Sequence, residues 1–147
     1  MNHRALAAAF LLLPSMLTAS AGAEADLSTP EAVVDAFHEA LGGGDRQAVL
    51  DLLTEDVLIF ESGGAELSRD EYAHHHLGSD MAFSAATESK VVDRRRGGDE
   101  ETSWVLTRTE TSGTFRDREI SARGTETMIL SRGESGWKIV HIHWSSR

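Results

Sequence analysis

The sequence predicts a single α+β domain in which helices come first and antiparallel strands follow. The first half of the chain places its apolar residues at helical spacing, whereas the second half is built of strand-like runs separated by glycine-containing turns. The 147 residues are 40% hydrophobic, which is enough to bury one core. An order of helices and then strands favours helices packed on one face of a curved sheet.

The first 23 residues have the pattern of a secretory signal peptide. A basic Arg4 comes first, an apolar stretch follows at 6–13, and small residues at 21–23 offer a cleavage site. This stretch is far shorter than the roughly 20 apolar residues that cross a bilayer. We therefore expect 24–147 to be the mature domain, located in the periplasm or secreted.

The composition excludes several classes of partner and site. The formal net charge is -10 at pH 7, so the chain should repel nucleic acid and anionic membranes, which are held through their phosphates. There is no cysteine, so neither a disulfide framework, a thiolate metal site nor a lipid-anchored amino terminus is expected.

Two helices and a strand are predicted at the start of the domain. In 28–31, hydroxyl residues precede a proline and give an N-cap and a first helical turn, and three glycines at 42–44 end this helix. Asp45 caps a second helix, which we expect to close at Asp56. The β-branched and aromatic run 57–60 predicts a buried strand.

A third, short helix is predicted by two local motifs. Ser68 and Glu71 have the spacing of a capping box, and Leu67 and Tyr72 have the spacing of a hydrophobic staple. The helix is expected to end near 77–78.

From Glu88 onward the pattern predicts antiparallel hairpins. Turns are expected at 97–99, at 112–113 and at 133–136, and the run 137–144 is the closing strand.

Two segments resemble a known family. The run GDRQAVLDLLTEDV at 44–57, preceded by a proline-capped helix, and the run GWKIVHIHWS at 136–145 resemble SnoaL-like domains of the nuclear transport factor 2-like superfamily. The resemblance implies a cone-shaped, cystatin-like fold, with a bent sheet around helices, a pocket between them and frequent dimerisation through the sheet. Its members include isomerases, cyclases and dehydratases. The aspartate base and tyrosine pair of the isomerase members cannot be placed here, because Tyr72 is the only tyrosine.

The closing strand carries the first pair of candidate catalytic residues. Strand alternation places His141 and His143 on one face together with Ile139. Such a pair can act in acid-base catalysis or jointly ligate a metal. The alternative is a pair of structural histidines hydrogen-bonded within the sheet.

The third helix carries the second histidine pair. Helical geometry places His75 and His76 on the same arc as Tyr72, with His74 on the opposite side. Because the staple should turn Tyr72 inward, we expect His75 and His76 to lean toward the core, where they would meet the pair on the closing strand. The alternative is surface decoration.

Two carboxylates complete the candidate site. Glu61 ends the first strand on the side of Ile59, and Asp80 follows His76 by four residues. Their alternatives are a solvated strand end and a helix cap. Together with the four histidines His75, His76, His141 and His143, these carboxylates would suit Zn(II) or Cu(II).

Arg108 and Trp104 join Tyr72 and Asp80 as candidate ligand-binding residues. An arginine that faces inward from a strand could bind an acidic substrate, but cross-strand ion pairing is the common alternative. For Trp104 the alternatives to ligand stacking are the core and a dimer surface.

Three functions are compatible with this pattern. The first is an exported pocket domain that binds a small organic ligand, with histidine acid-base catalysis of isomerase or dehydratase type. The second is a periplasmic protein that binds Zn or Cu through the same histidines, and the third is a non-catalytic dimerisation module. A homodimer is expected in each case.

Overall fold

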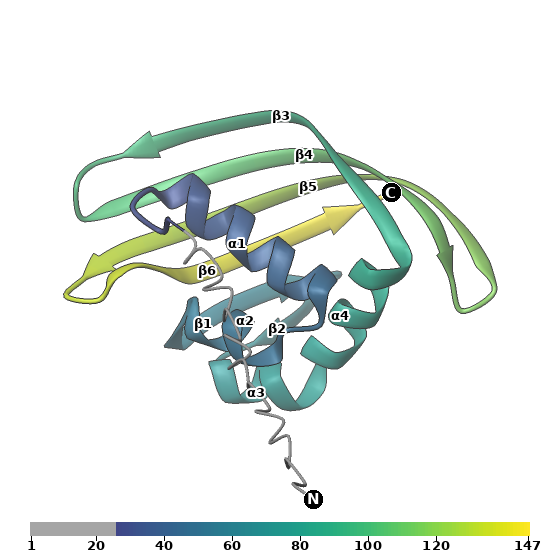
Figure 1. Ribbon diagram of the computed structural model, residues 1–147, viewed down its shortest axis with the longest axis horizontal. Coiled ribbons are helices and arrows are strands. Elements are labelled where there is room, and N and C mark those ends of the chain that lie inside the picture. The colour runs from purple at the N-terminus through teal and green to yellow at the C-terminus, as the bar shows by residue number, and fades with distance from the viewer. Residues whose placement is uncertain (1–25) are drawn as a thin grey trace, which may run out of the picture.

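The computed structural model describes residues 26–147, which form four helices against one six-stranded sheet (Figure 1). The expected signal peptide at 1–23 lies outside the described residues. Within 26–147, every helix is too short or too polar to cross a membrane.

The first helix begins and ends where the sequence predicts. Helix α1 (Pro30–Gly43) is capped by Thr29, whose hydroxyl accepts a 3.2 Å hydrogen bond from the backbone N–H of Ala32. Gly44 ends it in the left-handed conformation, at φ 73°, which glycine adopts without strain. Asp45 caps the next helix, as predicted.

The second helix is shorter than predicted. Helix α2 (Arg46–Asp51) gives way to strand β1 (Leu53–Glu61) well before Asp56, the expected end. The reason lies far away in the sequence, because the carbonyl of Leu52 accepts a 2.9 Å hydrogen bond from Ile139 of the closing strand. This pairing draws the chain into the sheet early.

A small strand and two helices follow β1. Strand β2 (Gly64–Glu66) was not predicted, whereas helix α3 (Arg69–His75) begins at the predicted cap, where the Ser68 hydroxyl accepts from the Glu71 N–H at 3.1 Å. Helix α3 stops at His75, and α4 (Leu77–Ala86) starts almost at once.

The predicted staple does not bury the Tyr72 ring. Leu67 remains 59% exposed, whereas Tyr72 is fully buried as a member of the hydrophobic core. Tyr72 therefore faces inward as expected, but it is buried by the hydrophobic core and not by Leu67.

The second half of the chain forms the predicted antiparallel hairpins. They comprise β3 (Thr87–Gly98), β4 (Thr102–Phe115), β5 (Arg118–Gly133) and β6 (Gly136–Ser146). The turn predicted at 112–113 is absent, because β4 continues past it.

The β4–β5 turn is formed by Arg116 and Asp117 instead. Their φ angles of 50° and 61° are both positive, as a two-residue turn that matches the twist of a hairpin requires. Gly113 lies within β4 and pairs with Ile120 of β5. The turn was missed because neither Arg116 nor Asp117 is a glycine or asparagine.

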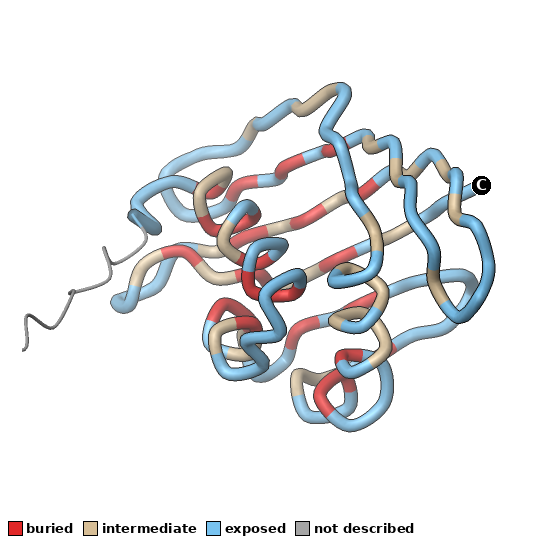
Figure 2. The backbone as a smooth tube through the Cα atoms, turned by 45° about the vertical axis from the view of Figure 1, so that its right-hand side comes forward, coloured by how far each residue is buried: buried red, intermediate tan, exposed pale blue. Residues whose placement is uncertain are grey.

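The sheet has the order β2-β1-β6-β5-β4-β3 and bends around the helices (Figure 1). The α+β fold class with a curved sheet is confirmed. One pair, β1 with β6, is parallel, and every other neighbouring pair is antiparallel. The buried residues of the helices and of the strand faces opposite them form one core (Figure 2). We call the helix side of the sheet its inner face and the other side its outer face.

Candidate functional site

A cavity of about 200 Å³ lies on the inner face, between the end of β1 and helices α3 and α4. We call it the acidic pocket because three carboxyl groups line it. Its lining consists of Ile59, Glu61, Ser62, Gly64, Ala65, Glu66, Tyr72, His76, Asp80 and Trp144. Four predicted site residues, Glu61, Tyr72, His76 and Asp80, are therefore brought together.

Tyr72 and Asp80 form a hydrogen-bonded pair within this lining. The phenol of Tyr72 donates to Oδ2 of Asp80 over 2.9 Å. Burial raises the pKa of Asp80 to about 6, with the charges of Glu61 and Glu66 adding to the rise and the Tyr72 hydrogen bond and His76 opposing it. Burial and the Asp80 charge raise the pKa of Tyr72, which stays protonated. Asp80 is thus a carboxylate that titrates close to neutral pH.

Glu66 organises the histidines at the rim of the pocket. Its side chain is buried, with Oε1 bonded to Nδ1 of His76 and Oε2 lying 3.2 Å from Nδ1 of His75. Because Nδ1 of His76 is engaged, Nε2 is the ring nitrogen left for a ligand. His75 pairs with Glu66 but does not line the cavity.

The helical histidines are more exposed than the sequence suggested. The side chains of His75 and His76 are 63% and 59% exposed, so the expectation that they lean into the core is wrong. Their imidazole rings lie at the surface and contact the carboxylate of Glu66. His74 is exposed as expected, with Nδ1 lying 2.7 Å from the carbonyl of Asp70.

A second buried carboxylate, Glu126 on β5, supports one wall of the pocket. Its Oε2 accepts from the indole Nε1 of Trp144 at 2.7 Å and lies 2.8 Å from Nε2 of His38 on α1. Burial raises the pKa of Glu126, but the His38 and Trp144 hydrogen bonds and the Arg94 charge outweigh it and leave the pKa below its ordinary value. Trp144 therefore lines the pocket, and its hydrogen bond to Glu126 holds the indole ring in place.

The histidines of the closing strand lie on the outer face. Val140 forms a β-bulge, because Ile139 pairs with Leu130 while His141 pairs with Ile129, the next residue back. The extra residue reverses the alternation, so Ile139 faces the core and His141 does not. The predicted shared face of Ile139 and the histidines is therefore wrong.

The environment of His141 confirms this placement. Its Nδ1 lies 2.9 Å from the carbonyl oxygen of Leu58, and its ring packs edge-on against Phe60, with ring centroids 5.2 Å apart. His143 pairs with Phe60 in the parallel register and is exposed. The two histidine pairs lie on opposite faces of the sheet, and the predicted convergence is wrong.

The proposed metal ligands are not assembled. Within 26–147, no group of three or more histidine, aspartate or glutamate side chains is close enough to share a metal ion. The histidines that would have formed a Zn or Cu site are separated by the sheet.

Arg108 and Trp104 also lie away from the acidic pocket. Trp104 is 39% exposed on the outer face, and its ring covers Gly97, where a Cβ would come within 2.2 Å of the ring. Arg108 lines a separate groove on that face.

Glu66 and Trp144 are the site residues that sequence reasoning missed. Glu66 is one of 24 acidic residues and shows no local sign of burial. Trp144 had a usable signal, because strand alternation places it on the face opposite His143, with Ile142.

The chain is similar to a known protein family and to solved structures. The family described as SnoaL-like domain matches residues 31–147. A candidate ketosteroid isomerase from Shewanella frigidimarina is 32% identical, with a TM-score of 0.73 over 77% of this chain and 91% of that one. No curated protein matches the chain.

Two further solved structures share the fold at lower identity. A candidate NTF2-like dehydratase from Streptomyces avermitilis is 19% identical, with a TM-score of 0.66 over 82% of this chain and 94% of that one. The CaMKII hub of S. rosetta is 19% identical, with a TM-score of 0.63 over 78% and 92%.

Proposed function

Because the chain belongs to the SnoaL-like domain family, we propose that its acidic pocket binds a small organic molecule and catalyses a proton transfer of the isomerase or dehydratase type. The Tyr72–Asp80 pair carries this proposal. It places a carboxylate with a pKa of about 6 in a cavity, and the 32% identical relative is a candidate ketosteroid isomerase.

Asp80 is the proposed general base. With a pKa of about 6 it is mostly ionised at pH 7, yet it holds a proton more tightly than an exposed aspartate would. A base whose pKa lies near the working pH combines the correct protonation state with a useful driving force. The Tyr72 phenol fixes the carboxylate through Oδ2 and leaves Oδ1 for the substrate.

His76 is the proposed partner of Asp80. When its ring is neutral, Nδ1 donates to Glu66 and Nε2 can accept a proton; when it is protonated, Nε2 can donate to a substrate oxygen. Asp80 would thus remove a proton from the carbon next to a carbonyl group. Nε2 of protonated His76 would donate a hydrogen bond to the carbonyl oxygen at the same time.

The size and charge of the pocket restrict the substrate. Pockets for drug-sized ligands have volumes of about 300–1,000 Å³, and this cavity has about 200 Å³. The cavity therefore favours a compact ligand. The carboxyl groups of Glu61, Glu66 and Asp80 disfavour an anionic ligand, so a compact neutral carbonyl compound fits best.

The test uses the small ketone cyclohex-3-en-1-one. Its isomerisation moves one proton from the carbon next to the carbonyl to the far end of the double bond, and the conjugated product absorbs in the ultraviolet. We expect the protein to accelerate this reaction and Asp80→Asn to lower the rate about 10²–10⁴-fold. Asp117→Asn, in the exposed β4–β5 turn, is the matched control and should keep the full rate.

Equal rates for the protein and Asp80→Asn would exclude Asp80 as the base. If the protein gives no acceleration and the ketone causes no NMR shift at the pocket, the proposed ligand class is wrong.

Export and dimerisation complete the proposal. The signal-peptide pattern at 1–23 supports a periplasmic or secreted location. The outer face exposes several large apolar side chains, which a second copy could cover; these are Leu58, Phe60, Trp104 and Leu106. Light scattering of the protein and of Leu106→Glu tests the dimer, and amino-terminal sequencing of the exported chain tests cleavage.

A further inference from the structure

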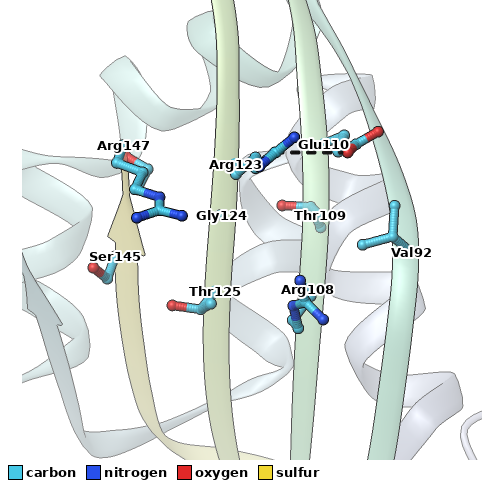
Figure 3. A pocket seen from close by; sticks show the side chains of 10 residues that line it. Val92, Arg108, Thr109, Glu110, Arg123, Gly124, Thr125, Ser145 and Arg147 are labelled. Atoms are coloured by element: carbon cyan, nitrogen blue, oxygen red, sulfur yellow. Dashed lines mark ion pairs between the residues drawn. The ribbon is translucent and has the colours of Figure 1, made fainter.

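A second cavity, of about 460 Å³, lies on the outer face of the sheet (Figure 3). It crosses the middle of β3, β4 and β5 and the end of β6 close to Arg147, on the side of the sheet away from the helices (Figure 3). We call it the outer groove. Its polar lining residues include Arg108, Arg123, Arg147, Glu110, Thr125 and Ser145.

Strand register explains why these side chains gather. Arg108 pairs with Thr125, which pairs in turn with Ser145, so these three stand in one outward row across β4, β5 and β6. The next outward row places Glu110 between Lys90 of β3 and Arg123 of β5. Neighbouring rows are about 7 Å apart, which is two strand residues.

Arg147 extends this second row beyond β6. Its backbone N–H donates to the carbonyl of Arg123 at 3.1 Å, and the Arg123 N–H donates back to the carbonyl of Arg147 at 3.0 Å. Arg123 and Arg147 thus lie on one side of Thr125 and Ser145, and Arg108 lies beside Thr125 (Figure 3).

The positive charge of the groove is only partly compensated. Asp93 of β3 lies opposite Arg108 in the strand register, but its carboxylate pairs with Arg95. Arg123 is 71% exposed, and its Nε lies 3.8 Å from Oε1 of Glu110, a long contact for an ion pair. Among residues 26–147, neither Arg108 nor Arg147 has an ion-pair partner. The chain as a whole is strongly acidic, with a net charge of -10, so this cluster runs against the overall charge.

We propose that the outer groove is a binding site for a small organic anion that bears a carboxylate or a phosphate. The guanidinium groups of Arg108 and Arg123 can each bind two oxygens of such a group, and the hydroxyls beside them can donate further hydrogen bonds. The volume of the groove admits a ligand body of ordinary metabolite size.

This site goes beyond the proposed catalytic function. The groove is cationic and lies on the outer face, whereas the acidic pocket lies on the inner face and disfavours anions. The two sites therefore select ligands of opposite charge, and each can be tested without the other.

The test is a titration of the ¹⁵N-labelled protein, followed by NMR, at constant ionic strength. Sodium phenyl phosphate and sodium benzoate are the two anionic probes, and benzyl alcohol is the neutral probe of similar shape. We expect saturable shifts of the Thr125 and Ser145 amides with at least one anion and none with the alcohol. The stronger anion shows which head group the site prefers.

Two charge-matched variants locate the site. Arg108→Gln with Arg123→Gln should weaken binding by about tenfold for each charge-assisted hydrogen bond lost. The control, Arg95→Gln with Arg116→Gln, removes the same charge from exposed arginines outside the groove and should leave affinity unchanged. Arg123→Lys keeps the charge without the planar fork and should fall between them.

The variants change exposed side chains, and unchanged core resonances will show that they fold. Equal losses in the two double variants would overturn the proposal, because binding would then follow net charge alone. Equal shifts with benzyl alcohol would also overturn it. So would amide shifts that follow protein concentration instead of probe concentration, because a second copy would then occupy the groove.

Discussion

The phenol of Tyr72 and Oδ2 of Asp80 lie 2.9 Å apart and link helix α3 to helix α4 across the inner wall of the acidic pocket. The bond stabilises the ionised form of Asp80, whereas burial and the neighbouring charges of Glu61 and Glu66 oppose ionisation. The balance leaves Asp80 with a pKa of about 6. The pocket therefore changes its charge in the range where many enzymes work.

Removal of the Tyr72 hydroxyl should move the pH dependence of the proposed reaction. Since the phenol lowers the pKa of Asp80, Tyr72→Phe should raise that pKa above about 6. The rate depends on ionised Asp80, so the rising limb of the pH-rate profile should shift to higher pH. Ser89→Ala removes an exposed hydroxyl far from the pocket and should leave the profile unchanged. A profile in Tyr72→Phe that shifts to lower pH would contradict the assignment.

Asp80→Asn should stabilise the protein at neutral pH. The folded-state pKa of about 6 lies above the unfolded value of 3.8, so folding favours protonated Asp80. Its favourable contribution is complete below pH 3.8 and is lost as the pH rises through about 6. Asparagine stays neutral, so the variant does not lose stability as the pH rises. We therefore expect the free energy of unfolding of Asp80→Asn at pH 7 to exceed that of the unaltered protein by about 1–2 kcal/mol, allowing for solvent screening.

Urea unfolding of both proteins at several pH values measures this gain. The difference between them should grow from pH 4 to pH 7 and then level off. A difference that is constant with pH would show that the substitution acts through packing instead of charge.

Loss of the Trp144 indole N–H should destabilise the fold, because this group donates a hydrogen bond to the buried Glu126. Glu126 is 7% exposed, and its Oε1 already has no hydrogen-bond partner within the described part of the chain. Trp144→Phe takes a donor from Oε2, which should cost about 1–3 kcal/mol. Trp104→Phe makes the same change at a ring that is 39% exposed and should cost much less.

The expected loss in Trp144→Phe also has a pH signature. The pKa of Glu126 is held below its ordinary value of 4.5, so its ionised form contributes stability above that value and loses it as the pH falls. The stability difference between Trp144→Phe and the unaltered protein should therefore shrink at acid pH. Thermal unfolding at pH 7 and below pH 4 would show whether it does.

Local signals in the sequence located most elements of the fold. The caps at Thr29, Asp45 and Ser68 and the glycines that end α1 act within a few residues, so they can be recognised without tertiary information. The end of α2 could not be placed in this way. It depends on Ile139, which lies almost ninety residues further along and draws Leu52 into the sheet.

The site was only half predictable, for a similar reason. Tyr72, His76 and Asp80 share one helical region, so their proximity follows from local spacing. The orientation of His141 depends on a bulge at Val140, and nothing in the local sequence marks it. One inserted residue moves the following side chains to the opposite face. Glu66 was missed because its burial comes from tertiary packing.

The two histidine pairs now predict different outcomes for the same substitution. His76→Gln keeps a donor for the buried Glu66 but removes the imidazole ring from the acidic pocket, so it should lower the rate of ketone isomerisation by about 10²-fold. His141→Gln keeps a donor for the Leu58 carbonyl on the outer face and should leave the rate unchanged. Both variants replace a histidine by glutamine, one at the acidic pocket and one on the outer face of the sheet, so each is the control for the other. Equal losses in both would mean that the outer face takes part in the chemistry, and a loss in His141→Gln alone would return the catalytic role to the closing strand.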